Sequence, residues 1–469
     1  MDFPLFHMDF LNNRFLIAVI AIVHVLINHP MAVGGIPLVT LLEWKGYRCT
    51  SPEDSAKWDR LAYRILFFFF LVTTTVGAMT GVGIWFSASL VNPAAIGSLI
   101  RVFFWAWFSE WVVFVTEVAM ILFYFLTWKK LSKTNKKKHI WIGVGLSIAS
   151  WLTMAIITSI LGFMMDPGNW MTDRSFLQGV LNPLYLPQLA LRSPLAMVMG
   201  GAAGLLLTPF FVGKDRDFRL KATKAISTWI LYWIPFTVLG AMSYWHMVPD
   251  VMMGNLPVAN TTQTFSDWYN ALLYIILAAC GTVTLVALWG WRGKYRTPAL
   301  VSAIPFLLLL LLLAHFERVR EFIRKPYAIG EYLYSNGIRV EDYPLFRKDG
   351  LLKHATYATV REITPENRVR AGKEVFMLAC TRCHTVNGVN SIAGNLRGMY
   401  GDAEWDPNLV AQYVDIMHHT RGYMPPFPGN DAEREALAHY LVFLQKNGDT
   451  LPGAQNDGAR LSHDRGRLP

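Results

Sequence analysis

The chain has 469 residues, of which 53% are hydrophobic and only 16% are charged, and it contains 17 tryptophans. This composition excludes an ordinary water-soluble protein and predicts a membrane protein that has the lipid bilayer as a partner. The formal net charge of +10 does not indicate nucleic-acid binding, because the excess lysines gather in short segments between apolar stretches.

Eight apolar stretches are each long enough to cross a bilayer as a helix. They cover residues 14–42, 61–90, 99–127, 140–165, 192–213, 226–247, 269–291 and 298–316. The first stretch is preceded by neither a positively charged segment nor a cleavage site, so we expect a retained helix. The predicted fold class is all-α: a polytopic transmembrane bundle of about eight helices, followed by a small α-helical domain.

Basic residues alternate between the loops that connect these stretches. Four loops are rich in them, with Lys45, Arg48, Lys57 and Arg60; Lys129, Lys130, Lys133, Lys136, Lys137 and Lys138; Lys214, Arg216, Arg219, Lys221 and Lys224; and Arg292, Lys294 and Arg296. The loops at 166–191 and 248–268 together hold only Arg174. Because basic loops stay in the cytoplasm, we expect both termini outside, in the cell membrane or inner membrane of a bacterium or archaeon.

Few ionisable residues lie inside the predicted membrane segments, and each of them needs a partner, a cavity or a cofactor. The first stretch contains His24 and His29, and the third contains Glu110 and Glu117, which are seven residues apart and so share one helix face. Hydrogen bonding within the bundle is one interpretation of His24 and of both glutamates. We interpret His29, which precedes Pro30, as a polar residue at a kink.

The outer end of the eighth stretch is crowded with charge. It carries His315, Glu317, Arg318, Arg320, Glu321, Arg324 and Lys325. Basic residues at an outward-facing end oppose the positive-inside trend and indicate an anionic ligand, and the carboxylates of haem propionates fit guanidinium groups well. The alternative is a simple cluster of ion pairs with Glu317 and Glu321.

Towards the C-terminus, Cys380-Thr381-Arg382-Cys383-His384 is the five-residue signature for covalent attachment of haem c. The two thiols form thioethers, and the imidazole of His384 takes one axial position on the iron. A zinc half-site or a dithiol redox pair would need a further Cys or His pair or a βαβ setting, and neither is apparent in the sequence. The pentad therefore predicts electron transfer, and its position agrees with an outside C-terminus, because haem c is attached after export.

The second axial ligand should come from well downstream. Met424, in the rigid loop Gly422-Tyr423-Met424-Pro425-Pro426-Phe427, suits a bond between a thioether and iron, with His418 and His419 as alternatives. Residues 365–448 resemble a monohaem class I cytochrome c, with an opening helix that contains Gly372 and Phe376, the haem pentad, the methionine loop and a closing helix over 431–445. We expect a linker over 338–364, a cytochrome c domain over 365–449 and a flexible tail over 450–469.

The preceding part of the chain, residues 1–337, resembles the large subunit of cytochrome bd-type oxidases from Asn13 onwards, in motifs and in helix order. Arg14-Phe15 followed by His24 is similar to the first helix of that family, and the segment from Trp58 to Leu90 and the third helix, which ends at Trp128, follow the same plan. The most specific match is Glu321-Phe322-Ile323-Arg324-Lys325-Pro326-Tyr327-Ala328-Ile329-Gly330-Glu331, which is similar to the family's Glu-x-Gly-Arg-Gln-Pro-Trp-Ala-Ile-Gly-Glu.

This resemblance implies two high-spin haems, of type b or d, inside the bundle. It implies that His24 is the axial ligand of one haem and Glu321 that of the other, with Arg324 beside it. Glu117 matches a carboxylate that the family uses for proton delivery, whereas Glu110 is one position away from the family's spacing of eight.

Several departures from the family are consistent with one another. After Leu181-Asn182-Pro183, the family's low-spin haem histidine is replaced near Leu191 and Arg192, and its methionine is replaced near Leu277, so the low-spin haem site looks deleted. The loop that binds quinol in the family is shortened to about 248–268, which makes quinol oxidation doubtful. The family's ninth helix is absent, and residues 332–353 lead into the cytochrome c domain instead.

The resemblance predicts a terminal oxidase that takes electrons from a soluble or membrane cytochrome c, or from another one-electron donor. It would reduce O2 to water with protons from the cytoplasm. One alternative is the reduction of another small acceptor, such as nitric oxide, at the same haems. The other is a non-catalytic electron-relay subunit of a larger respiratory complex. By analogy with the family, a second membrane subunit or a homodimer is also expected.

Overall fold

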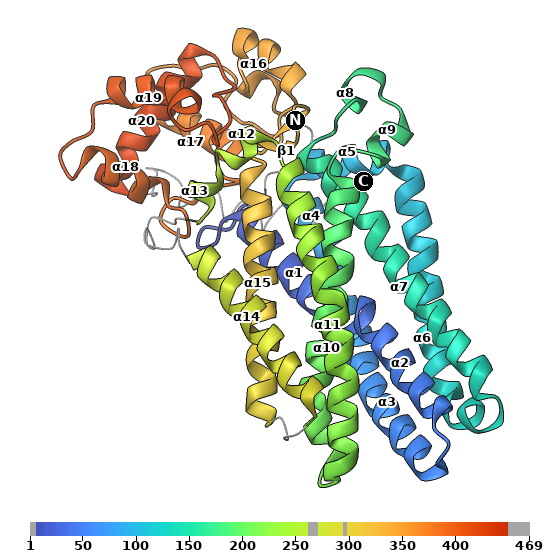
Figure 1. Ribbon diagram of the computed structural model, residues 1–469. Coiled ribbons are helices and arrows are strands. Elements are labelled where there is room, and N and C mark those ends of the chain that lie inside the picture. Colours follow the sequence, from blue (N-terminus) through green and yellow to red (C-terminus); the bar gives the residue numbers. More distant parts are fainter. Residues whose placement is uncertain (1–5, 261–270, 294–297, 449–469) are drawn as a thin grey trace, which may run out of the picture. The chain divides into compact units, whose positions relative to one another are not determined.

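The computed structural model describes residues 6–260, 271–293 and 298–448 (Figure 1). The chain divides into two compact units. One comprises Met1–Ile17, Leu90–Ala94 and Tyr332–Pro469, and the other comprises Ala18–Ser89 and Ala95–Glu331. The predicted tail over 450–469, as well as Lys294, Arg296 and the end of the shortened loop over 261–268, lies outside the described residues.

Long apolar helices build the second unit. Within the described residues, eight helical segments are long and apolar enough to span a membrane: Asn13–Arg48, Pro52–Val91, Phe104–Thr134, Lys136–Met165, Tyr185–Val212, Arg216–Met247, Leu272–Arg292 and Ala299–Ile323. They confirm the predicted all-α fold and the predicted number of spans.

Two of these spans contain a short π-helical turn. The first span is α1 (Asn13–Asn28), η1 (His29–Val33) and α2 (Gly35–Arg48), and the second is α3 (Pro52–Val72), η2 (Thr73–Gly77) and α4 (Ala78–Val91). The other spans are α6 (Phe104–Thr134), α7 (Lys136–Met165), α10 (Tyr185–Val212), α11 (Arg216–Met247), α14 (Ala271–Arg292) and α15 (Ala299–Ile323). Shorter elements connect them: α5 (Pro93–Val102), α8 (Trp170–Asp173), α9 (Phe176–Val180), α12 (Asp250–Met253), α13 (Leu256–Asn260) and the strand β1 (Tyr327–Ile329).

Polar residues at the turns explain why consecutive spans begin where they do. Ser51 accepts a hydrogen bond from the backbone of Asp54 at the start of α3, and Asn135 accepts one from Lys138 at the start of α7. Asp215 does the same for α11. Each side chain satisfies a backbone N–H that the first turn of a helix leaves without a partner, so each cap fixes the start of a span.

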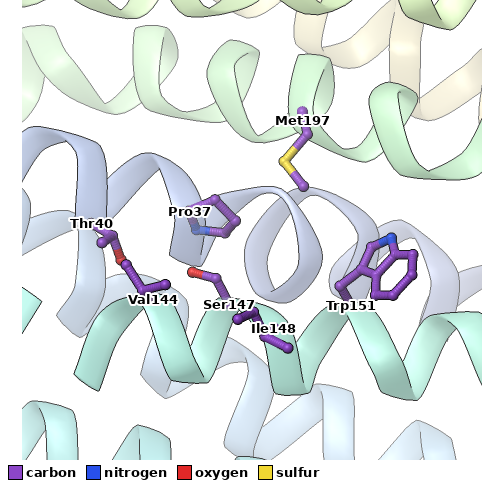
Figure 2. Close-up of a pocket in the computed structure, with 7 residues that line it drawn as sticks. All are labelled: Pro37, Thr40, Val144, Ser147, Ile148, Trp151 and Met197. Carbon is purple, nitrogen blue, oxygen red and sulfur yellow. The ribbon is translucent and has the colours of Figure 1, made fainter. Parts of the chain in front are cut away.

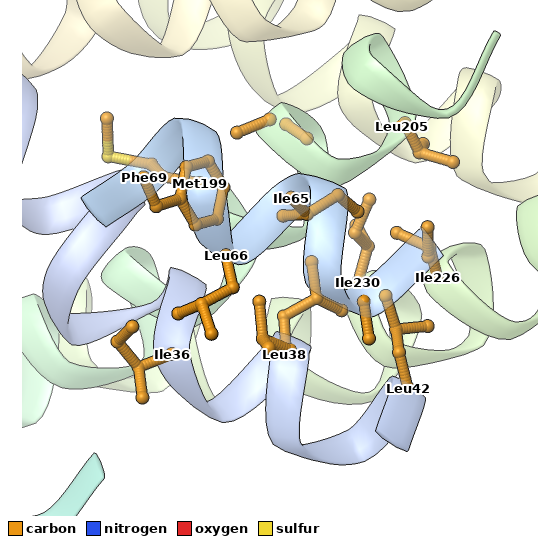
Figure 3. Packing of buried hydrophobic residues seen from close by; sticks show 14 of the residues in the cluster. Ile36, Leu38, Leu42, Ile65, Leu66, Phe69, Met199, Leu205, Ile226 and Ile230 are labelled. Atoms are coloured by element: carbon orange, nitrogen blue, oxygen red, sulfur yellow. The ribbon is translucent and has the colours of Figure 1, made fainter. Parts of the chain in front are cut away.

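Helices α2, α3, α10 and α11 meet in the core of the bundle (Figure 3), to which α6, α7, α14 and α15 also contribute buried residues. Buried aliphatic and aromatic side chains from the four helices interdigitate there, among them Leu38, Phe69, Met199 and Ile230. Glycines let two of the helical segments approach closely, since a Cβ atom on Gly200 would lie 2.4 Å from the backbone of Gly34. Small residues permit close approach of membrane helices, and this explains how α10 becomes the most buried of the eight spans.

Several span boundaries differ from those predicted by hydropathy. The first span continues beyond residue 42 to Arg48, and α7 begins at Lys136 instead of residue 140. The predicted third stretch, 99–127, is divided, because α5 ends at Val102 and α6 begins at Phe104. Hydropathy locates the apolar part of a helix, whereas the helix itself extends into charged turns whose long side chains reach water.

Four helices form the main part of the cytochrome c domain in the first unit: α17 (Arg368–Ala379), α18 (Ile392–Tyr400), α19 (Pro407–Thr420) and α20 (Asp431–Asn447). Helices α17 and α20 cross closely, since a Cβ atom on Gly372 would lie 2.0 Å from the carbonyl oxygen of Ala436. The rings of Phe376 and Tyr440 lie next to this crossing, with their centroids 5.8 Å apart. The predicted opening and closing helices are therefore present and packed together.

The segment predicted as a linker, 338–364, is folded against the cytochrome c domain. It contains η4 (Val340–Asp342), α16 (Tyr343–Asp349) and η5 (Leu352–His354), and it follows the strand β2 (Leu333–Tyr334). The buried carboxylate of Glu433 on α20 accepts hydrogen bonds from the backbone N–H groups of Leu351 and Leu352, each 2.7 Å long. The segment 338–364 therefore belongs to the same compact unit as the helices of the cytochrome c domain.

Candidate functional site

The haem pentad follows directly on α17. The backbone N–H of Cys380 still bonds to the carbonyl of Phe376, and the N–H groups of Cys383 and His384 both bond to the carbonyl of Cys380, at 3.1 and 2.9 Å. This tight turn places both thiols and the imidazole beside the end of one helix. In the described part of the chain no disulfide joins Cys380 to Cys383, so both sulfur atoms suit thioether formation.

The imidazole of His384 is held in the orientation that an iron ligand needs. Its Nδ1 donates to the carbonyl oxygen of Asn390 at 3.1 Å, and the Asn390 side chain in turn donates to the carbonyl of Cys383 at 2.8 Å. A hydrogen bond at Nδ1 fixes the ring and leaves Nε2 to face a metal. Two thiols and one oriented imidazole are the donor set of haem c, and the pentad therefore fits that cofactor.

The loop that carries Met424 is fixed on both sides. Its backbone N–H bonds to the carbonyl of Arg421 at 2.8 Å, and its carbonyl oxygen accepts a hydrogen bond from Nδ1 of His418 at 2.5 Å. Tyr343 donates its hydroxyl to the carbonyl of Pro426 at 3.1 Å. His419 is exposed at the end of α19. Met424 and His418 thus belong to one cluster, and Met424 as the second axial ligand stays a prediction.

A buried cation accompanies the pentad. The side chain of Arg382 is 9% exposed and donates from Nη1 to the carbonyl of Leu378 at 3.0 Å. Burial lowers the pKa of this guanidinium to about 10. The group is still protonated at neutral pH, because this value remains well above 7. The haem c site is therefore electropositive on this side.

Inside the bundle, His24 faces the second span. Its Nδ1 lies 3.1 Å from the carbonyl oxygen of Gly77 and 3.2 Å from the hydroxyl of Thr80. Gly81 permits this packing, because a Cβ atom there would lie 3.1 Å from the imidazole ring. Gly77 is the last residue of the π-helical turn η2, and such turns often occur at functional sites.

The charged residues at the predicted outer end of α15 form two separate groups. Glu321 makes a two-point ion pair with Arg324, at 2.5 Å and 3.0 Å, and Arg324 also donates to the carbonyl of Ala328. Glu317 is buried between two guanidinium groups, 2.6 Å from Arg192 and 2.9 Å from Arg320. Both ion pairs belong to the simple cluster that the sequence left as an alternative to propionate binding.

Arg192 stands near the position at which the resemblance predicted the loss of a haem-ligating histidine. It is the centre of a buried polar network. Only 2% of this residue is exposed, and besides Glu317 it contacts the buried His29, to whose Nε2 it donates at 3.4 Å. The guanidinium also lies over the ring of Phe316 at 5.5 Å. His29 is therefore more than a residue at a kink, because it joins the first span to α10 and through Arg192 to α15.

The two glutamates of α6 have different environments. Glu117 accepts hydrogen bonds from Ser150 at 2.6 Å and from Thr153 at 3.0 Å, both on α7. For Glu110, no hydrogen bond or ion pair is found among the described residues. The two hydroxyl donors satisfy the carboxylate of Glu117 within the bundle.

Sequence reasoning missed a fully buried cluster on α2, α6 and α7. Glu43 and His139 are 0% exposed, with 2.6 Å between Oε1 of Glu43 and Nδ1 of His139, and Tyr124 donates to Oε2 of Glu43 at 2.7 Å. Nε2 of His139 faces the carbonyl of Tyr124 at 3.0 Å. Hydropathy placed Glu43 and His139 just outside the spans. One sequence feature could have indicated this cluster: Tyr124 follows Glu117 by seven residues and so lies on the same face of the helix.

An open, largely nonpolar pocket of about 300 Å³ lies between α2, α7 and α10 (Figure 2). Pro37 and Thr40 of α2, Ser147 and Trp151 of α7, and Met197 of α10 line it. Ser147 lies one helical turn before Ser150, which donates to Glu117. The few polar atoms in the wall suit a nonpolar occupant better than a chain of water molecules.

Comparison with known proteins identifies the C-terminal domain. A family described as cytochrome C oxidase, cbb3-type, subunit III matches residues 367–441, a range that contains the haem pentad and Met424. A search of curated proteins finds no match to the chain. The C-terminal part of this membrane protein is a cytochrome c domain, similar to subunit III of cbb3-type oxidases, with a covalent haem c that transfers electrons.

Proposed function

We propose that the protein is a cytochrome c-dependent terminal oxidase of the bd superfamily. In this proposal, Cys380, Cys383 and His384 would hold a haem c that accepts single electrons from a cytochrome c or another one-electron donor, and His24 and Glu321 would hold two high-spin haems in the bundle as the next acceptors. Those haems, of type b or d, supply an open iron site at which O2 is reduced to water. The residues of the bundle bind the haems, exclude water and deliver protons.

The observation that carries the proposal is the setting of His24. A histidine inside a membrane span is costly unless it has a partner or a cofactor. Metal-ligating histidines make bonds of the kind that joins its Nδ1 to the Gly77 carbonyl, and the amide of Asn28, which lies 3.0 Å from Nε2, would give way to the iron. Glu321 would be the ligand of the second haem, and its two-point contact with Arg324 would hold the carboxylate in place.

A membrane orientation with both termini outside supports electron entry from the outer face. Three loops that are predicted to be inside meet through ion pairs: Lys136 with Asp59, Lys221 with Asp54, and Lys57 with Asp215. Segments that are predicted to be outside meet as well, since Asn255 donates to the carbonyl of Lys325 at 2.8 Å and the N–H of Gly330 bonds to the carbonyl of Met164, in the last turn of α7, at 3.1 Å. This division follows the alternation of the basic loops.

Proton delivery from the cytoplasm is supported by the arrangement on α6. Tyr124, Glu117 and Glu110 follow one another at intervals of seven residues, which is about 10 Å per step at 1.5 Å per residue. Tyr124 belongs to the buried cluster with Glu43 and His139, and Glu117 has its own hydroxyl partners. In the proposal, Glu117 holds the proton next to the haems, and Glu110 lies further along the path.

The replacement of the low-spin haem ligand supports haem c as the electron entry. Arg192, at that position, is ion-paired with Glu317 and buried. A guanidinium is not a haem ligand, so we expect no low-spin haem at this position, and the shortened loop over 248–268 is the reason to expect no quinol oxidation. A second membrane subunit or a second copy of the chain would cover part of the lipid-facing surface.

Oxygen uptake by the purified protein, supplied with reduced cytochrome c, tests this function. We expect uptake by the unmodified protein and none by Glu321→Gln, which should also change the spectrum of the high-spin haems. Glu341→Gln is a matched control, because Glu341 is exposed, lies in the first unit and forms an ion pair with Arg339. Consumption of nitric oxide without oxygen uptake would favour the reductase, and no turnover with either acceptor would favour an electron-relay subunit.

A further inference from the structure

The N-terminal segment contacts the haem pentad and the loop that follows it. Residues of Met1–Ile17 belong to the same compact unit as the cytochrome c domain. The backbone N–H of Val389, in the loop after the pentad, donates to the carbonyl oxygen of Phe10 at 3.1 Å. Gly388 permits this contact, because a Cβ atom there would lie 2.5 Å from the same oxygen.

Hydrogen bonds within the N-terminal segment also hold its conformation near the pentad. Asn13 is 1% exposed and donates its side-chain amide to the carbonyl of Phe6 at 2.7 Å. The side chain of Asn12 accepts a hydrogen bond from the N–H of Phe15 at 2.8 Å. These bonds fix the residues on both sides of Arg14, so its position does not depend on its own side-chain contacts alone.

Arg14 brings a positive charge to the edge of the pentad. Its Nη1 lies 3.5 Å from Sγ of Cys383, a residue 369 positions away in the sequence. In the holoprotein this sulfur is the thioether that joins the haem to the chain. A guanidinium stays charged at any physiological pH, and in a half-buried setting its field is only partly screened by water.

We propose that Arg14 sets the reduction potential of haem c, and that the N-terminal segment 6–14 is a wall of the haem c site that holds it there. A fixed positive charge beside the macrocycle stabilises the reduced form, which carries one more electron, and so raises the potential. The proposal concerns haem c alone. It therefore stands or falls independently of the two haems proposed for the bundle.

A redox titration of haem c in the full-length protein, followed by its visible spectrum, tests the role of the charge. At the midpoint of the unmodified protein, Arg14→Gln should lower the ratio of reduced to oxidised haem c about tenfold, a shift of about 59 mV for one electron. The reduction potential of haem c in Arg14→Lys should stay much closer to that of the unmodified protein, because lysine keeps the positive charge. Arg397→Gln is the control, since Arg397 is exposed and pairs with Asp402 at 3.1 Å.

A second pair of variants tests the wall without touching the charge. Gly388→Ala should displace the segment at Phe10 and shift the potential in the same direction as Arg14→Gln, whereas Gly398→Ala, with nothing within 4 Å of its Cβ position, should not. If Arg14→Gln fails to retain haem c on a haem-stained gel, the glycine pair decides alone. An unchanged potential in Gly388→Ala, or an equal shift in Arg14→Lys and Arg14→Gln, would overturn the proposal.

Discussion

Two histidines of the cytochrome c domain direct Nδ1 to a backbone carbonyl, His384 to Asn390 and His418 to Met424. The first belongs to the haem pentad, so its role follows from the sequence. The second lies next to the predicted methionine ligand and has the same orientation towards its carbonyl. Substitutions of Met424 and His418 can therefore show which of the two side chains is the second ligand of the iron.

Replacing Met424 by leucine should remove the sulfur ligand and lower the reduction potential of haem c, because a methionine ligand favours ferrous iron. The change should also appear in the visible and magnetic circular dichroism spectra as a new spin or ligation state. His418→Gln should leave the axial ligation unchanged, and His419→Gln is the exposed neighbour for comparison. If Met424→Leu keeps the native spectrum and His418→Gln loses it, His418 is the ligand.

At the scale of helices, buried ion pairs connect spans that are distant in sequence. Glu317 of α15 has two guanidinium partners, Arg192 on α10 and Arg320 one turn further along α15. Its removal leaves two buried cations without their carboxylate, whereas removal of Arg192 leaves the contact with Arg320. The two substitutions should therefore differ in cost.

Glu317→Leu should lower the free energy of unfolding by about 3–5 kcal/mol, the usual effect of breaking a buried ion pair, and Arg192→Leu by less. Unfolding of the purified protein in mixed detergent micelles, followed by far-ultraviolet circular dichroism, measures both. Arg339→Leu, in an exposed ion pair with Glu341 and Asp342, should cost less than about 1 kcal/mol. Equal effects for all three variants would contradict a structural role of the buried pair.

The sequence predicted the helices of this protein better than the buried contacts between them. The eight spans and the helices on either side of the pentad were predictable, because long apolar stretches and the haem signature are local patterns. The cluster of Glu43 and His139 was not, since Glu43 lies in the penultimate turn of its span and His139 in the first turn of α7, both just beyond the predicted apolar stretches. The docking of Phe10 beside Gly388 depends on contacts between opposite ends of the chain, and no local pattern encodes it.

For the whole molecule, the orientation in the membrane determines which side supplies electrons and which supplies protons. We expect Lys137→Cys to be protected from a membrane-impermeant thiol reagent in intact cells, and Thr172→Cys to react, when Cys49 and Cys280 are replaced by serine. Both positions are exposed, Lys137 in the first turn of α7 and Thr172 in the connecting helix α8 after its other end, and the alternation of basic loops predicts that they lie on opposite sides. The reverse labelling pattern would place the cytochrome c domain inside and contradict the proposed electron entry.

The number of haems per chain tests the central claim most directly. A pyridine haemochrome assay on the purified protein separates covalently attached haem c from haems that can be extracted with acidified solvent. The account predicts one haem c and two extractable haems for each chain, with the extractable haems reduced or lost in His24→Ala and Glu321→Gln. One haem c and no extractable haem in the unmodified protein would contradict it.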